Sequence, residues 1–267
     1  MVKVGVNGAL GRMGSRILHL AYQSTDFKIT GAFEHPKSEA LGTELDKALG
    51  LPGSFKLKIE TVTPAAMKNV DVVIDFSGPE GTTRCLNAAL KAGKRIVIGT
   101  TGIDAAGIKE IQAASKTIPV LFSPNMSIGA NFLFEISRIA AAKLKAGYDI
   151  EIVEAHHRLK KDAPSGTAKK IAEVIAEEKG WDLKKAARDG REGITGERTK
   201  DEIGIHVVRA GDIVGEHTVI FSGPGETIEL VHRAQSRDAF ARGALVAALF
   251  LSKKSKGLYS MKDVLAL

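Results

Sequence analysis

The residues best suited to chemistry lie in one short stretch of the chain, from Glu154 to Thr167. It contains the adjacent histidines His156 and His157, then Lys160, and it ends in Pro-Ser-Gly-Thr at the start of a helical run. Imidazole exchanges protons near neutral pH, and backbone N–H groups at a helix start favour anions. These groups together indicate a pocket for a carboxylate-bearing substrate that exchanges a proton. A solvated basic loop before an ordinary helix is the alternative, and this stretch alone does not decide between them.

A second group of candidate residues lies near the start of the chain. A short apolar strand runs into Asn-Gly-Ala-Leu-Gly-Arg-Met-Gly, residues 7–14, and a helix follows. Glycines at such a turn let the backbone approach a pyrophosphate, which then rests on the helix N-terminus. The spacing Gly-x-x-Gly-x-x-Gly is a variant of the commoner Gly-x-Gly-x-x-Gly, so the motif gains its weight from the strand before it and the helix after it. The loop predicts a dinucleotide site.

An acidic residue supports this interpretation. Glu34 lies at the end of the second predicted strand, about 20 residues beyond the glycines, where an acid can accept hydrogen bonds from an adenosine ribose. A carboxylate favours an unphosphorylated ribose, whereas the nearby Arg12, His35 and Lys37 could offset repulsion of a 2′-phosphate. We therefore expect use of NADH, NADPH or both. A solvated carboxylate at a strand end is the alternative for Glu34.

The elements around these motifs follow two patterns. Over roughly the first 125 residues, strand and helix signals alternate, as in a parallel sheet with helical crossovers. Gly99 to Thr101 follow one of these strands at the edge where open α/β sheets bind ligands, and there they could contact the nicotinamide half of a cofactor or simply form a turn. The expected strands are Lys3–Val6, Lys28–Phe33, Val70–Phe76, Arg95–Ile98 and Val120–Phe122, and the expected helices end near Tyr22, Leu90 and Ser115.

The second half of the chain shows a different pattern of helix and strand signals. We expect a helix from Asn131 to Ala146, a strand from Ile150 to Val153 and a helix from Ala168 to Lys179. Residues 184–200 are charged, contain glycine and show no apolar period, so we expect a long loop there. Three strands follow, Ile203–Arg209, His217–Ser222 and Thr227–His232, then a helix from Ala239 to Leu251 and a short tail. The sequence predicts a Rossmann-type parallel α/β domain (residues 1–126 with 238–267) and a smaller α+β domain with a mixed, open sheet (127–237).

Composition excludes several classes of function. The chain has 267 residues, 44% of them hydrophobic, and no apolar run approaches the length of a membrane span. Its single cysteine, Cys85, excludes an intrachain disulfide and a multi-cysteine metal site, and we expect it to be a buried packing residue. The net charge of +7 is spread among 31 acidic residues with only 5% aromatics, which argues against nucleic-acid binding. No histidine or carboxylate cluster has metal-ligand spacing, and nothing resembles a secretory signal, so we expect no metal and a cytoplasmic protein.

With these two motifs combined, the chain resembles the 4-hydroxy-tetrahydrodipicolinate reductase family, formerly called dihydrodipicolinate reductases, of lysine biosynthesis. The matching segments extend over nearly the whole chain: Gly8–Gly14, Val97–Gly102, Glu154–His157, Asp162–Thr167, Arg191–Arg198 and Arg209–His217. The resemblance implies NAD(P)H-dependent reduction of a small cyclic dicarboxylate, and a homotetramer in which the open sheet pairs with sister subunits. One departure concerns His35, where some relatives carry arginine, and this weakens any inference about 2′-phosphate recognition.

The resemblance also assigns roles to individual residues. His156 would be the catalytic acid/base and Lys160 a second proton donor, while His157, Gly166 and Thr167 would bind the substrate. The implied cofactor contacts are Gly8, Ala9, Leu10, Gly11, Arg12, Met13, Glu34, Gly99, Thr100, Thr101, Ser123, Pro124, Asn125 and Met126. At 123–126 we expect contacts through the backbone, because the outer residues vary among relatives.

The sequence leaves two other functional hypotheses open. An aspartate-type dehydrogenase of the same two-domain plan would keep the glycine loop but would not need the His-His-x-x-Lys block. A non-catalytic nucleotide sensor would keep the loop and lose His156 or Lys160, and both are present here. The remaining strand histidines, His206, His217 and His232, read as packing or interface residues rather than as parts of the site.

Overall fold

The chain forms two compact units, each with its own sheet and core. The computed structural model describes residues 1–52, 56–144 and 147–267. Residues 1–128 and 237–267 make up the first unit, and residues 129–236 make up the second. Among the described residues, no helix is long and apolar enough to cross a membrane.

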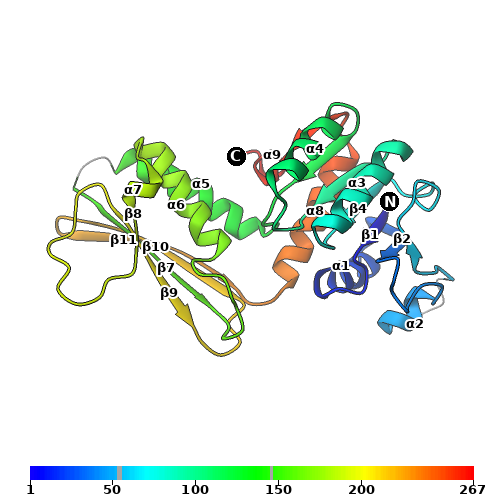
Figure 1. The fold of residues 1–267 in the computed structure, drawn as a ribbon, viewed down its shortest axis with the longest axis horizontal. Helices are drawn as coiled ribbons and strands as arrows, with labels where there is room; N and C mark the ends of the chain where they lie inside the picture. Colours follow the sequence, from blue (N-terminus) through cyan, green and yellow to red (C-terminus); the bar gives the residue numbers. More distant parts are fainter. Residues whose placement is uncertain (53–55, 145–146) are drawn as a thin grey trace. The chain divides into compact units, whose positions relative to one another are not determined.

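The first unit is built on a parallel sheet of seven strands (Figure 1). In spatial order they are β12 (Gly257–Tyr259), β6 (Pro119–Phe122), β5 (Arg95–Ile98), β4 (Val72–Asp75), β1 (Val2–Asn7), β2 (Phe27–Glu34) and β3 (Glu60–Thr61). Strand β1 lies between β4 and β2, so the strand order reverses beside it. A reversal of this kind opens a crevice at the carboxyl ends of the strands, where such sheets bind ligands.

Helices cover both faces of this sheet. They are α1 (Arg12–Gln23), α2 (Leu45–Leu49), α3 (Pro79–Ala92), α4 (Ala105–Ser115), α8 (Asp238–Ser252) and α9 (Met261–Leu265). Val72 and Ile74 of β4 pack in the same core cluster as residues of α1 and α8, whereas Val73 packs with residues of α3 and α4. Successive strand residues thus enter opposite cores, as the two-residue strand period requires. Cys85 is fully buried in the second of these cores, as predicted.

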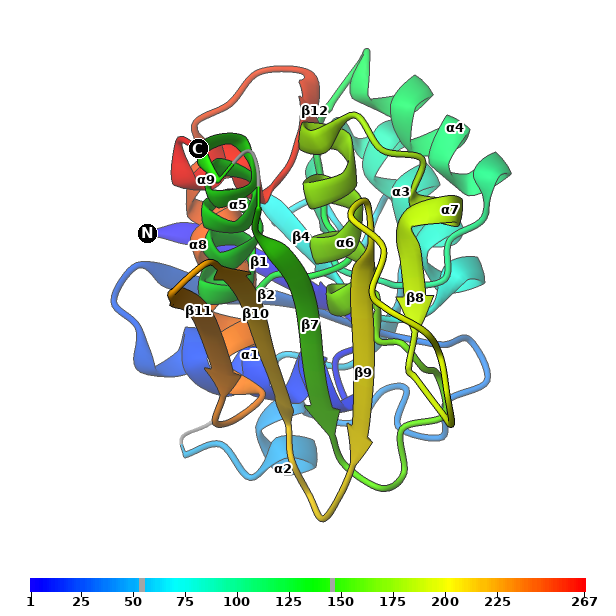
Figure 2. The same ribbon diagram turned by 90° about the vertical axis from the view of Figure 1, so that its left-hand side faces the viewer.

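The second unit has a mixed sheet of five strands with helices packed on one face (Figures 1 and 2). In spatial order the strands are β11 (Glu226–Ala234), β10 (Gly215–Gly223), β7 (Asp149–His156), β9 (Ile203–Arg209) and β8 (Ala187–Asp189). Strand β7 pairs antiparallel with β10 and parallel with β9. The helices are α5 (Ile128–Lys143), α6 (Gly166–Lys179) and the short α7 (Leu183–Ala186). The predicted fold class, a parallel α/β sheet plus a smaller mixed sheet, is confirmed.

Three local predictions were wrong. The strand expected at Ile150–Val153 extends to His156, because Glu154 and His156 are buried on the same face of β7 as the apolar residues before them. The segment expected to be a loop from 184 begins with α7 and β8, and β8 pairs with β9. The C-terminal tail forms β12 and α9. The end expected for the helix from Asn131, at Ala146, lies outside the described residues.

Beyond β8, the irregular segment of residues 190–200 is fixed to the sheet by charge. Glu151 of β7 accepts hydrogen bonds from Arg191, Arg198 and His206. Burial opposes the ionisation of Glu151, but these donors outweigh it and lower its pKa to about 2. The segment lacks an apolar period because ion pairs, rather than hydrophobic contacts, hold it in place.

Candidate active site

The glycine loop between β1 and α1 has the close backbone approaches that a phosphate loop needs. Gly8 has a φ of +77°, which side chains rarely tolerate, and a Cβ on Gly14 would lie 2.0 Å from the Gly8 carbonyl oxygen. The backbone N–H groups of Gly8 and Ala9 donate to the Phe33 carbonyl at 2.9 and 3.1 Å. The loop is therefore packed tightly onto α1 and held by strand β2.

Glu34, at the end of β2, is also tied to this loop. Its Oε1 accepts a hydrogen bond of 2.7 Å from the Leu10 N–H, and its Oε2 accepts one from the His35 N–H. A carboxylate oxygen has more than one lone pair, so Glu34 can accept further hydrogen bonds from a ligand. Its position beside the loop matches the place where dinucleotide-binding folds hold the adenosine ribose.

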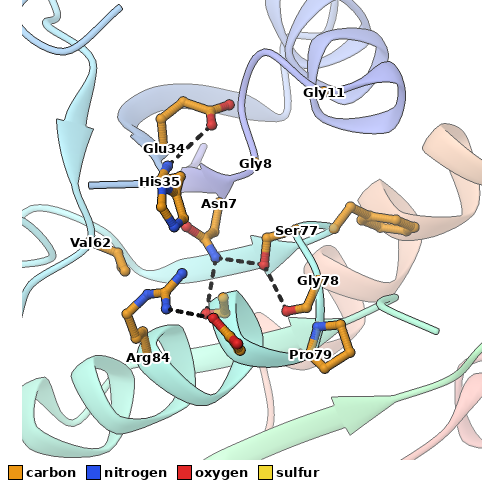
Figure 3. A pocket seen from close by; sticks show the side chains of 13 residues that line it. Asn7, Gly8, Gly11, Glu34, His35, Val62, Ser77, Gly78, Pro79 and Arg84 are labelled. Atoms are coloured by element: carbon orange, nitrogen blue, oxygen red, sulfur yellow. Dashed lines mark hydrogen bonds and ion pairs between the residues drawn. The ribbon is translucent and has the colours of Figure 1, made fainter. Parts of the chain in front are cut away.

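A cavity of about 590 Å³ opens at the ends of these strands (Figure 3). Its volume suits a small-molecule or cofactor site. The lining residues come from the end of β1 and its loop, from the residues that follow or end β2, β3 and β4, and from α3: Asn7, Gly8, Gly11, Glu34, His35, Val62, Phe76, Ser77, Gly78, Pro79, Glu80, Gly81 and Arg84. In Figure 3, His35, Val62 and Arg84 lie together on one side of this cavity. Three of the predicted cofactor residues, Gly8, Gly11 and Glu34, thus line one cavity.

A buried carboxylate organises the floor of this region. Asp75, at the end of β4, is inaccessible to solvent and accepts hydrogen bonds from Asn7, Ser77, Thr82 and Thr100. Four donors satisfy a carboxylate that has no cationic partner among these contacts. Thr100, a predicted cofactor residue, therefore uses its hydroxyl group to fix the turn after β5.

The other predicted cofactor residues do not line this cavity. Ala9 is fully buried, Met13 packs against the same core, and Arg12 is exposed at the first position of α1. Gly99 and Thr101 belong to the turn after β5. Ser123 to Met126 follow β6, where the Ser123 hydroxyl donates to the Asn125 carbonyl at 2.7 Å and Pro124 is exposed. These segments lie at the carboxyl ends of β5 and β6, and their contact with a cofactor stays a prediction.

The second candidate group lies wholly in the second unit, at the end of β7. Glu154 and His156 are two residues apart on the buried face of the strand, and Oε2 of Glu154 lies 2.6 Å from Nδ1 of His156. Arg209, opposite His156 on β9, donates two hydrogen bonds to Glu154, of 2.8 and 2.9 Å. The site thus contains an imidazole backed by a carboxylate and a guanidinium.

Burial and these charges set the protonation of the pair. Burial lowers the pKa of His156, Glu154 acts to raise it, and Lys160 and Arg209 lower it further, so that the pKa lies below its ordinary value. Burial opposes the ionisation of Glu154, but hydrogen bonds from Arg209, His156 and Ser165 outweigh it and lower its pKa. Glu154 is thus a carboxylate near neutral pH, and the lowered pKa of His156 favours its neutral imidazole.

The start of α6 lies against the same residues. Ser165 is the N-cap of α6, and its hydroxyl oxygen accepts from the Ala168 N–H at 3.1 Å. Its own backbone N–H donates to Glu154 at 2.9 Å, and its hydroxyl lies 3.0 Å from Nε2 of His217. Gly166 and Thr167 are the first two residues of the helix. The helix start, where anions bind favourably, is therefore held in place by Glu154 and His217.

The loop between β7 and α6 carries the remaining candidates. His157 is the first residue after β7, and its Nδ1 is buried with no hydrogen-bond partner in the described part of the chain. Lys160 Nζ lies 2.9 Å from Oδ1 of Asp162, and the Asp162 carbonyl accepts a bond of 2.7 Å from Arg209. All five predicted catalytic and substrate-binding residues therefore lie between the end of β7 and the first turn of α6.

Sequence reasoning missed three members of this cluster. Glu154 stands in the predicted motif but received no role, and Arg209 was seen only as part of a matching segment. His217 was expected to be a packing or interface residue, yet its ring lies 5.2 Å from that of His156, edge to face, and contacts the N-cap of α6. Burial is the main reason that the pKa of His217 falls to about 3. A signal for Glu154 was available, because an acid two residues before a histidine lies on the same strand face.

Comparison with known proteins now identifies the family. Residues 2–126 match the sequence model described as dihydrodipicolinate reductase, N-terminus, and residues 129–265 match the one described as dihydrodipicolinate reductase, C-terminus. The chain belongs to the dihydrodipicolinate reductase family. The 4-hydroxy-tetrahydrodipicolinate reductase of Syntrophotalea carbinolica is 46% identical over the full length of both chains. The enzyme of that name from Dechloromonas aromatica is 48% identical and covers 99% of this chain and 98% of its own.

A solved structure agrees with this assignment. The dipicolinate-bound dihydrodipicolinate reductase from Paenisporosarcina sp. TG-14 has a TM-score of 0.76 and 25% identity, over 97% of each chain. As a member of the dihydrodipicolinate reductase family, the chain is an NAD(P)H-dependent oxidoreductase. The readings as an aspartate-type dehydrogenase and as a nucleotide sensor are therefore set aside.

Proposed function

We propose that the chain reduces 4-hydroxy-tetrahydrodipicolinate, by way of dihydrodipicolinate, to tetrahydrodipicolinate in lysine and diaminopimelate biosynthesis. The observation that carries this proposal is the cluster at the end of β7. A buried imidazole, Lys160 and the start of α6 lie together in one unit. The first unit would bind the dinucleotide, and the second would bind the substrate.

The cofactor supplies a hydride when it is bound. The glycine loop and Glu34 would hold its adenosine diphosphate half, because the cavity of about 590 Å³ lies against both. The tight contact between Gly8 and Gly14 supports this fit, because it leaves the backbone of the loop bare of side-chain atoms. NADH and NADPH both remain candidates on these residues.

The chain's own residues would bind the substrate and supply its proton. One substrate carboxylate would lie on the backbone of Gly166 and Thr167 at the start of α6, and His157 would contact the other. Reduction of a conjugated imine needs a hydride at one carbon and a proton at the neighbouring carbon, and His156 would donate that proton. Lys160 would offset the negative charge that develops in the ring and would act as a second proton donor.

The activity is tested with substrate generated in situ by the condensing enzyme that precedes it. We expect loss of nicotinamide absorbance in the presence of NADH or NADPH, and no loss when the condensing enzyme is omitted. His156→Gln should lose turnover while its affinity for the dinucleotide stays unchanged. Absence of cofactor oxidation by the unmodified chain with either nucleotide would refute the proposed activity.

We also propose that the chain forms a homotetramer through the second sheet. Helices α5 and α6 pack on one face of this sheet, and β9 and β11 carry exposed apolar side chains. These are Val207, Val208, Ile228 and Val231, each 38–44% exposed. A sheet with such residues is typical of a subunit interface. Sedimentation equilibrium measures the assembly, and a monomer at micromolar concentration would contradict it.

A further inference from the structure

The carboxylate of Glu154 is buried, and hydrogen bonds occupy both of its oxygens. It is 1% exposed, and its two oxygens accept four hydrogen bonds. The donors are Nδ1 of His156, the two terminal nitrogens of Arg209 and the Ser165 N–H. The three donor residues belong to β7, β9 and the N-terminus of α6, so this one carboxylate joins these elements.

The strands dictate this arrangement. Residues 154 and 156 face the same way because side chains of a strand alternate, and Arg209 reaches them because β9 is parallel to β7 with Arg209 opposite His156. A guanidinium that donates two parallel bonds fixes the plane of a carboxylate as well as its position. Glu154 therefore cannot rotate away from His156 without breaking the pair with Arg209.

The charge on Glu154 determines which nitrogen of His156 carries a proton. A carboxylate is an acceptor only, so the imidazole nitrogen that faces it, Nδ1, must be the donor. Nε2 is then the nitrogen that remains for the substrate. It points toward the backbone of Gly215, where a Cβ would lie 3.1 Å away.

The same carboxylate also holds the groups around the histidine. Its bond from Ser165 fixes the start of α6. Arg209 donates to the Asp162 carbonyl, and the side chain of Asp162 pairs with Lys160. His156, the start of α6 and Lys160 are thus all linked to one ion pair, that between Glu154 and Arg209.

We propose that Glu154, clamped by Arg209, is the positioning residue of this active site: it fixes His156 with the proton on Nδ1 and aligns the start of α6 with it. The inference deepens the proposed function and rests on it for its kinetic consequences. The alternative is an ion pair that only stabilises the fold. A structural pair would affect unfolding, but it would leave the tautomer of His156 and the pH profile of turnover unchanged.

The pH profile follows from the charges that face His156. Glu154 favours the protonated form of His156, and Lys160 and Arg209 disfavour it. The ring of His217, which packs edge to face with that of His156, is neutral near neutral pH. Removal of the negative charge lowers the pKa of His156 further. If protonated His156 is the acid, turnover falls as pH rises through this pKa. The fall in turnover should therefore begin at lower pH in Glu154→Gln than in the unmodified chain.

The test uses the full chain with Glu154→Gln, Arg209→Lys and the control Glu151→Gln. Glu151 lies three residues earlier on β7 and accepts from two arginines and a histidine on the opposite side of the strand, so it is matched in chemistry but not in place. Nitrogen-15 NMR of the histidine rings reports the tautomer of His156, and titration of NADH fluorescence reports cofactor binding. Neither readout depends on activity, so a failure of the proposed reaction can be distinguished from a failure of this inference.

We expect Glu154→Gln to lose turnover on the order of a hundredfold, as loss of such a supporting partner does elsewhere, with unchanged NADH affinity. In this variant the Nδ1–H tautomer of His156 should no longer be the predominant one. Arg209→Lys keeps the charge and should lose turnover less, and it preserves the test if Glu154→Gln does not fold. Glu151→Gln should keep the tautomer, the pH profile and the turnover. An unchanged tautomer and pH profile in both folded site variants would overturn the proposal.

Discussion

Gly215 of β10 lies against His156 so closely that a methyl group at residue 215 would sit 3.1 Å from Nε2 of the imidazole. This distance is shorter than an ordinary van der Waals contact. The ring has little freedom to give way, because its Nδ1 is bonded to Glu154 and it packs edge to face with the ring of His217. The bare backbone at this position thus leaves room around the nitrogen from which the proton would leave.

The first prediction concerns this contact. Gly215→Ala should lower turnover about tenfold or more, because small displacements of a reacting group are costly, while NADH binding stays unchanged. Steady-state kinetics and fluorescence titration measure both quantities. Thr218→Ala is a suitable control, because Thr218 lies on the opposite face of β10. Wild-type turnover in Gly215→Ala would show that this space has no role.

A second prediction compares two glycines of the glycine loop, Gly14 and Gly11. A Cβ on Gly14 would lie 2.0 Å from the Gly8 oxygen, whereas one on Gly11 would lie 3.1 Å from the same atom. Gly14→Ala should therefore destabilise the fold by about 1–3 kcal/mol, as overpacking substitutions do. It should also abolish most nucleotide binding. Gly11→Ala should have a smaller effect on both. Thermal unfolding and NADH titration test the order, and equal effects would contradict it.

A third prediction links stability to pH through His217. Burial lowers its pKa to about 3 in the folded chain, whereas the unfolded chain binds a proton near the ordinary value of 6.5. The stability associated with neutral His217 is thus fully present above pH 6.5 and is lost as the pH falls from 6.5 toward 3. The loss should approach about 1.4 kcal/mol per pH unit for one proton.

Urea unfolding between about pH 5 and 6.5 measures this dependence, because most carboxylates stay ionised there. His217→Asn should show a shallower slope than the unmodified chain over the same window. His156 and His232 also have lowered pKa values and keep their contributions in both proteins. Parallel slopes would show that His217 does not titrate as its burial implies.

The sequence was most informative where a local rule determines the structure. The glycine loop could be recognised because its spacing, the strand before it and the acid after it all describe one short segment. The buried face of β7 was harder, because Glu154 and His156 are polar and therefore end an apolar pattern without ending the strand. Their burial depends on Arg209, which is 55 residues from Glu154 along the chain.

The remaining omissions have the same physical cause. His217 joins the site only because β10 pairs with β7, and Asp75 gathers Asn7 and Thr100 only because β4 lies between β1 and β5. Strand β8 has a charged sequence and forms through pairing with β9 rather than through its own propensity. Such contacts between distant segments carry no local signal, so motif spacing alone identifies the principal groups but not the residues that orient them.

Arg84 provides the last prediction, which concerns the choice between NADH and NADPH. Arg84 lines the same cavity as Glu34 and His35, and within the described residues its charge has one ion pair, a long contact of 3.8 Å with the exposed Glu80. A 2′-phosphate near Glu34 would be repelled by that carboxylate, whereas a guanidinium from α3 could bind it. Arg84→Met should therefore weaken NADPH binding about tenfold and change NADH binding much less. Fluorescence titration with both nucleotides tests this, with Lys91→Met on the same helix as the charge-matched control. Equal weakening for both nucleotides would instead place Arg84 at a part of the cofactor that the two share.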